Sequence, residues 1–225
     1  PACLLLMMQP DIGQTLLIFL AWAILVFISG ISLPIILTFF SFSLLSLIYM
    51  VFFIPKFAYI KNRILSFFNP IDGTHNFQSD KAIDAISSGG YFGKGIGEGT
   101  LKNRVPEAHT DFILAIIGEE FGLFGVSIVI GLFGFLIVRM FGIAKESIQN
   151  NKHFAALMAQ GIAIWFSIQC TINIAVNLGL FPTKGITLPL LSFGGSSLLV
   201  CIIALAIVLR IDHENKRNLR GQHYK

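Results

Sequence analysis

The chain has 225 residues, of which 55% are hydrophobic and only 12% are charged, and its mean hydropathy is +0.78. Soluble globular domains carry about 25% charged residues, so this composition excludes an ordinary water-soluble enzyme. The net charge of +4 is small, and we expect no nucleic-acid partner.

Four long stretches contain no charged side chain, and each is wide enough to cross a membrane. No Asp, Glu, Lys or Arg occurs in residues 12–55, 121–138, 154–183 and 185–209. A hydrocarbon core of about 30 Å takes about 20 helical residues, so the first stretch holds two spans and each of the others holds one. We therefore expect an all-α polytopic membrane bundle with five transmembrane helices, near residues 13–30, 34–54, 114–138, 156–178 and 189–209.

The start of the chain predicts that more sequence precedes it. Residues 2–8 are typical of the end of a further span, and neither an initiator Met nor a basic n-region comes before the first apolar run. We interpret the chain as a piece of a longer protein, and a complete five-span protein that has lost its Met is the alternative. Residues 1–225 are expected to form one membrane domain.

Basic residues predict the orientation, because short cytoplasmic connections retain Lys and Arg. Such residues gather at 139–152 and in the tail at 210–225. We place this basic tail in the cytoplasm, facing anionic lipid, and the long segment 55–111 outside as an extracytoplasmic loop. The cysteines have no metal or redox spacing and are expected to pack among the helices; they are Cys3, Cys170 and Cys201.

The long loop carries two distinctive stretches. Residues 55–70 interleave cations with large apolar side chains, a pattern that predicts a helix at the lipid surface. This helix serves either as an anchor or to bring cations such as Arg63 to a lipid phosphate. Residues 87–100, SSGGYFGKGIGEGT, contain Lys94 among glycines whose backbone can approach a ligand closely. They match neither a P-loop nor a dinucleotide fingerprint.

The loop ends in the run VPEAHTDFILAIIGEE, where Thr110 or Asp111 can cap the next helix. The alternative to a cap is a functional carboxylate at the membrane rim that accepts a proton from a hydroxyl. Glu119 and Glu120 follow at positions that differ in direction around the helix, so both cannot face one cavity. Each is either hydrogen-bonded structurally or functional, since intramembrane carboxylates are costly. Gly118 and Gly122 predict close helix packing.

The last two spans are unusually polar for membrane helices. The span near 156–178 carries amides that must face protein or a wet cavity. The following run, NLGLFPTKGITLPLLSFGGSS, combines prolines and glycines around Lys184, and such irregular backbone is tolerated in a membrane where it lines a cavity.

Three motifs in this order, GGYFGKGIGEGT, PEAHTDFILAIIGEEFG and NLGLFPTKGITLPLLSFGGSS, resemble the SEDS family of bacterial peptidoglycan glycosyltransferases, which includes the FtsW, RodA and SpoVE types. The resemblance covers nearly the whole chain and is greater to the division-type FtsW branch than to the RodA branch. Family members usually have about ten spans, so it implies that this chain is the C-terminal half. Lys81, Ala82 and Phe193 depart from the family pattern.

The resemblance implies that the chain polymerises lipid II into glycan at the division septum of the inner membrane, with Asp111 as general base. Undecaprenyl pyrophosphate-linked glycan, a class B penicillin-binding protein and other division proteins are the implied partners. The candidate cofactor is a divalent cation, Mg²⁺ or Mn²⁺, although no metal-ligand motif occurs. Substrate contacts are expected from Arg63, Lys94, Lys102, Glu107, His109 and Lys184, and the cavity candidates are Glu119, Gln169, Asn173, Asn177 and Ser196.

Two other functions are compatible with these residues. A lipid II flippase would line a translocation path with the amides and glutamates of the last spans. A non-catalytic division scaffold would only recruit the penicillin-binding protein. We also expect that the piece alone lacks part of the cavity wall and with it activity.

Overall fold

The computed structural model describes residues 5–6, 12–53, 77–99, 110–181 and 185–222. Its helices are α2 (Ile12–Ile28), α3 (Leu33–Phe53), α5 (Phe77–Gly89), α6 (Ile113–Gln149), α7 (His153–Asn177) and α8 (Gly195–Gln222). Four of them are long and apolar enough to cross a membrane, and α2 is a shorter apolar helix. The expected all-α membrane bundle is confirmed.

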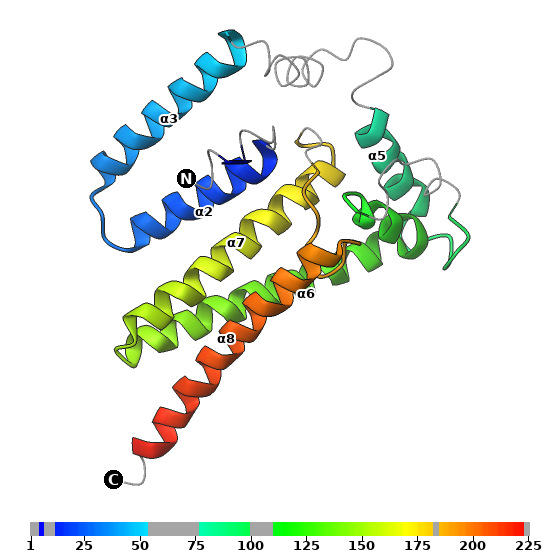
Figure 1. Cartoon of the computed structure of the whole chain (residues 1–225). Coiled ribbons are helices and arrows are strands. Elements are labelled where there is room, and N and C mark those ends of the chain that lie inside the picture. Colours follow the sequence, from blue (N-terminus) through cyan, green and yellow to red (C-terminus); the bar gives the residue numbers. More distant parts are fainter. Residues whose placement is uncertain (1–4, 7–11, 54–76, 100–109, 182–184, 223–225) are drawn as a thin grey trace.

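The centre of the bundle is the antiparallel pair α6 and α7, with α8 packed against both (Figure 1). α2 lies on α7, and α3 contacts only α2 among the described helices. Most side chains of α3 are exposed, as expected for a helix whose apolar surface faces lipid. Phe19 of α2 stacks on Phe40 of α3, with ring centroids 5.8 Å apart.

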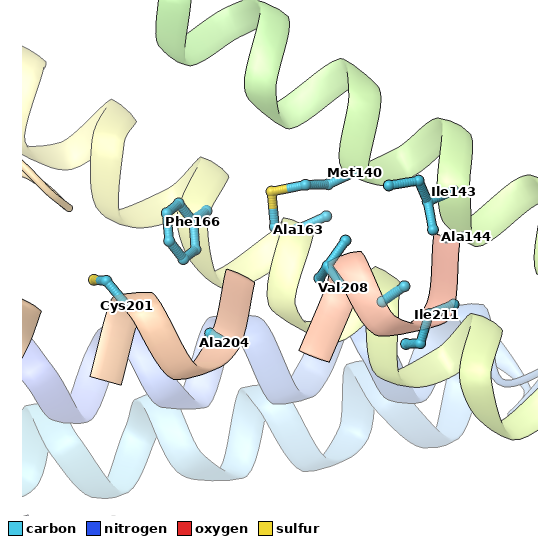
Figure 2. Packing of buried hydrophobic residues seen from close by; sticks show 10 residues of the cluster. Met140, Ile143, Ala144, Ala163, Phe166, Cys201, Ala204, Val208 and Ile211 are labelled. Carbon is cyan, nitrogen blue, oxygen red and sulfur yellow. The ribbon is translucent and has the colours of Figure 1, made fainter. Parts of the chain in front are cut away.

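Small side chains allow α6, α7 and α8 to pack closely (Figure 2). The core cluster combines them with a few large ones: Met140, Ile143, Ala144, Ala159, Ala163, Phe166, Cys201, Ala204, Val208 and Ile211. Cys170 is buried in a second cluster beside Phe133 and Leu188. The expected packing role is confirmed for Cys170 and Cys201, and Cys3 lies outside the described residues.

The two ends of the bundle differ in construction. At one end, which we call the loop end, α5 and the start of α6 meet the end of α7 and the segment that leads to α8 (Figure 1). At the other, the turn end, α6 connects to α7 through Asn151, whose φ of 58° is left-handed. There Asn215 of α8 is fully buried and donates to Ser147 Oγ at 2.8 Å.

Several helix boundaries differ from the expected ones, and one helix was not expected. α6 runs to Gln149, well past Arg139, because a helix continues in water after its membrane part ends. α8 begins at Gly195 rather than near residue 189, since residues 189–191 form a turn ahead of it. α5 lies in the long loop and was not expected. The lipid-surface helix predicted at 55–70 lies outside the described residues.

Candidate active site at the loop end

Two asparagines one turn apart on α7 hold the segment that begins α6. Asn173 and Asn177 are 1% and 0% exposed. Their Nδ2 groups donate to the backbone carbonyl of Asp111, at 2.9 Å from Asn173 and 3.0 Å from Asn177. Because buried amides are costly unless bonded, these contacts fix the main chain at Asp111 firmly.

Asn177 also caps α6 from a different helix. Its Oδ1 accepts a hydrogen bond from the N–H of Ala115, at 3.2 Å, a first-turn N–H that also reaches the Phe112 carbonyl at 3.0 Å. The N-cap residue is Phe112, and it makes no side-chain capping bond. The N-cap position therefore falls one residue after Asp111, and a capping bond from the side chain of Thr110 or Asp111 stays a prediction.

The carboxylate of Asp111 lies next to glycine backbone. Asp111 is half-buried, and a Cβ on Gly185 would stand 3.5 Å from its Oδ2. Gly185 has a φ of +65°, a conformation that favours glycine. The segment after α7 thus passes beside the carboxylate with no side chain between them.

Hydrogen bonds hold the segment that follows α7 in place. Asn173 Nδ2 also donates to the Ile186 carbonyl at 2.7 Å, and Gln169 Nε2 donates to the Thr187 carbonyl at 2.9 Å. Ser192 Oγ accepts from the Leu188 N–H at 2.7 Å. The three buried amides of α7 therefore bond to main-chain carbonyls around Asp111.

The start of α8 joins the same cluster through a serine. Thr187 Oγ1 and Ser197 Oγ lie 3.3 Å apart, whereas the predicted cavity residue Ser196 is exposed on the first turn of α8. Thr187, Ser192 and Ser197 were not singled out from the sequence. The run TLPLLSFGGSS contained them, but spacing alone does not separate Ser196 from Ser197.

Glu119 and Lys94 form a second cluster at the loop end. The Glu119 side chain is 0% exposed, and its Oε1 lies 3.4 Å from Lys94 Nζ. Glu120 Oε1 accepts a hydrogen bond from the Gly97 N–H at 3.2 Å. Glu119 is thus buried against the glycine-rich loop, which leaves its role as a cavity residue a prediction.

The other predicted substrate contacts lie outside the described residues; they are Arg63, Lys102, Glu107, His109 and Lys184. In the parts of the chain that the structure describes, no three His, Cys, Asp or Glu side chains lie close enough to hold a metal ion. A divalent cation therefore stays a prediction, with no ligands assigned among the described residues.

This arrangement is suited to proton transfer at a membrane rim. A half-buried carboxylate stands beside open glycine backbone, and its main chain is fixed by bonds from a neighbouring helix. Such a group can accept a proton from a hydroxyl placed within hydrogen-bond reach. The fold and this site define a multi-pass membrane protein with a carboxylate site at one end of its helix bundle.

The chain belongs to the FtsW/RodA/SpoVE family, whose profile, described as a cell cycle protein, matches residues 1–217. It is 41% identical over 221 residues to the probable peptidoglycan glycosyltransferase FtsW of Nitrosomonas europaea, covering 97% of this chain and 56% of that protein. The equivalent protein of Legionella pneumophila is 39% identical over 215 residues, covering 94% of this chain and 54% of that protein. The chain therefore spans about half the length of these curated relatives, and the SEDS resemblance is confirmed.

Two solved structures share the fold. A chain from work on "structural coordination of polymerization and crosslinking by a peptidoglycan synthase complex" has a TM-score of 0.72 and 28% identity, over 96% of this chain and 59% of that one. A variant of the Thermus thermophilus rod shape determining protein RodA has a TM-score of 0.61 and 27% identity, over 96% of this chain and 54% of that one.

Proposed function

We propose that the chain forms the catalytic half of a peptidoglycan glycosyltransferase that polymerises lipid II, with Asp111 as general base. The observation that carries this proposal is the position of Asp111: its main chain is held by Asn173 and Asn177 while its carboxylate faces the bare backbone of Gly185. Asn177 also gives the first turn of α6 a side-chain acceptor from α7, so α7 holds the backbone on which this carboxylate stands at both Asp111 and Ala115.

In the proposed reaction, Asp111 takes the proton of the GlcNAc 4-hydroxyl of an incoming lipid II. The hydroxyl oxygen attacks the anomeric carbon of the terminal MurNAc of the growing glycan. The bond from that carbon to undecaprenyl pyrophosphate breaks, and the configuration inverts. Because an aspartate carboxylate is a weak base, the proton moves late, once the attacking hydroxyl has become more acidic.

The leaving pyrophosphate requires positive charge. Arg63, Lys94, Lys102 and Lys184 are the candidates that the family resemblance supplies, and Lys184 is adjacent in sequence to Gly185. Under this proposal the loop end faces the outside of the cytoplasmic membrane at the division septum, and the basic end of α8 faces the cytoplasm. A class B penicillin-binding protein is the proposed partner.

The contacts of the amides favour an enzyme over a flippase. A translocation path would need polar side chains that line open space, but Gln169, Asn173 and Asn177 donate to main-chain carbonyls. The check is to measure on which side of a vesicle membrane labelled lipid II lies. Transfer of lipid II from one side to the other by the protein would favour the flippase.

The test uses Asp111→Asn in the natural protein that carries these residues, reconstituted with its penicillin-binding protein and labelled lipid II. We expect glycan polymerisation to fall about a hundredfold or more, the range found for loss of a general base. Asp84→Asn is the matched control, because this aspartate is exposed on α5. Polymerisation by Asp111→Asn at the unmutated rate, with a normal melting temperature, would overturn the assignment of the base.

A further inference from the structure

α6 is not one continuous helix. Gly122 has a φ of 67° and a ψ of −166°, which are non-helical values. In an unbroken α-helix the N–H of Leu123 would donate to the carbonyl of Glu119, and the N–H of Phe124 to that of Glu120. The break at Gly122 separates these four groups, and each then needs another partner.

The glycine-rich loop, residues 90–97, supplies all four partners. The N–H groups of Lys94 and Gly95 donate to the carbonyls of Glu119 and Glu120, at 3.0 and 3.1 Å. On the other side of the break, Leu123 donates to the Gly90 carbonyl at 2.9 Å and Phe124 to the Tyr91 carbonyl at 3.1 Å. Four loop bonds therefore replace two helix bonds and bridge the break.

Glycine is required both in the loop, at Gly93, and in α6, at Gly122. A Cβ on Gly93 would overlap the Glu120 carbonyl, and a Cβ on Gly122 would overlap the backbone of Tyr91, Phe92 and Gly93. Gly93 and Gly122 also have φ values of 82° and 67°. The loop can enter the break only because both positions lack a side chain.

A buried ion pair fastens the loop to the first part of α6. The Glu119 carboxylate is fully buried and faces Lys94 Nζ at 3.4 Å, with the Lys94 side chain 35% exposed. A Cβ on Gly99 would stand only 2.7 Å from Glu119 Oε2, so the loop backbone closes over this carboxylate. The low local dielectric strengthens the attraction between these two charges, so changing either side chain weakens what holds the loop.

The Lys94–Glu119 pair and the four loop bonds together hold the first part of α6, next to Asp111. The nine residues of α6 before the break, 113–121, follow Asp111 directly, and their direction is set by what holds them at Gly122. We propose that Lys94 and Glu119 are a positioning pair that keeps the loop in the break and thereby orients Asp111. The inference rests on the proposed function of Asp111, and it gives Lys94 a positioning role in place of the pyrophosphate contact considered above.

The first measurement is amide hydrogen exchange in the natural protein. Glu119→Gln and Lys94→Met should each speed exchange at residues 90–95 and 123–124, because the four bonds across the break open more often. Lys94→Arg keeps the charge and should leave exchange close to that of the unmutated protein. Lys145→Met, an exposed lysine near the turn end, is the control. Unchanged exchange in both single variants would overturn the pair, whatever Asp111→Asn shows.

The second measurement separates positioning from direct pyrophosphate binding by Lys94. If the pair orients Asp111, each single variant lowers kcat for lipid II polymerisation about tenfold to a hundredfold with little change in KM. The double variant Lys94→Met/Glu119→Gln should then be no slower than the worse single variant, because the two act as one unit. If the losses in kcat of the two single variants instead multiply in the double variant, Lys94 is a substrate ligand and the proposal is overturned. The same holds if KM rises only in Lys94→Met. The double variant removes both charges, so it keeps the test open if a single variant fails to fold.

Discussion

The side-chain oxygen of Asn177 accepts a hydrogen bond from the backbone N–H of Ala115, 3.2 Å away on the neighbouring helix. A capping bond of this kind usually comes from a residue adjacent in sequence. Here it comes from α7, and the same side chain donates to the Asp111 carbonyl at 3.0 Å. The start of α6 and the end of α7 are therefore linked at the candidate site.

We predict that Asn177→Ala lowers both stability and activity. It removes one of two acceptors for the Ala115 N–H and one of two donors to the Asp111 carbonyl, so we expect a loss of about 1–3 kcal/mol from the lost hydrogen bonds and the space left in a fully buried position. Thr171→Ala, an exposed polar residue of the same helix, should change stability by less than about 0.5 kcal/mol. Thermal unfolding in detergent, followed by the polymerisation assay, checks both. Equal melting temperatures for the two variants would contradict the role given to Asn177.

A methyl group at position 185 should affect activity more than stability. Gly185→Ala places a Cβ about 3.5 Å from Asp111 Oδ2 in a left-handed backbone, so we expect the polymerisation rate to fall about tenfold. Gly30→Ala is the matched control, because Gly30 has a φ of +93° and nothing within 4 Å of the added Cβ. Both variants carry backbone strain of about 1–2 kcal/mol. Equal polymerisation rates would show that the space beside Asp111 is not used.

Contact between α5 and α6 depends on Gly118. A Cβ there would stand 2.8 Å from Ile86 Cγ1 and 3.1 Å from Ile86 Cα, so Gly118→Ala should destabilise the protein by about 1–3 kcal/mol through overpacking. Adding Ile86→Ala removes the nearest atom and should restore part of the loss. Gly131→Ala in the same helix meets nothing within 4 Å and should be neutral or stabilising by up to about 1 kcal/mol. Melting temperatures that rank Gly131→Ala below Gly118→Ala would refute this.

At the turn end, replacing Asn215 alone should lower stability more than replacing Asn215 and Ser147 together. Asn215 Nδ2 donates to Ser147 Oγ at 2.8 Å, and Asn215 Oδ1 has no hydrogen-bond partner in the part of the chain that the structure describes. We expect Asn215→Ala to lower stability by about 1–2 kcal/mol, through the lost bond and the space it leaves. Asn215→Leu combined with Ser147→Ala should be close to neutral, because both polar groups are replaced. The two melting temperatures test this, and Asn215→Ala should have the lower one.

The membrane part of the fold could be predicted from the sequence because charge is excluded from lipid. The charge-free stretch 121–138 lies within α6, and 154–183 covers nearly all of α7. Helix ends were predicted less well, since α6 continues beyond the charge-free stretch into the charged residues around Lys145. Absence of charge marks the lipid-facing length, whereas helix ends depend on backbone bonding.

α5 was missed because its composition is polar. The residues that it buries are small, Ala82 and Ala85, with Gly89 close against Gly118. Small residues three and four positions apart were the available signal. They predict close packing only when the partner helix is already known.

The site was predicted in part. Asp111 and the amides of α7 were singled out, and the structure brings them together. The capping role of Asn177 and the break at Gly122 could not be predicted, because their partners lie far away in the sequence. Gly118 fits the predicted close helix packing, but Gly122 instead admits the loop that begins about 30 residues earlier.

The bonds across the break in α6 are made by main-chain atoms alone. The largest side chains of the loop are therefore not needed to hold it, and Tyr91, Phe92 and Ile96 are 76%, 85% and 78% exposed. A fluorophore attached at Phe92→Cys would report on this loop while leaving all four bonds intact. The loop thus offers a labelling position whose side chain takes no part in the bonds across the break.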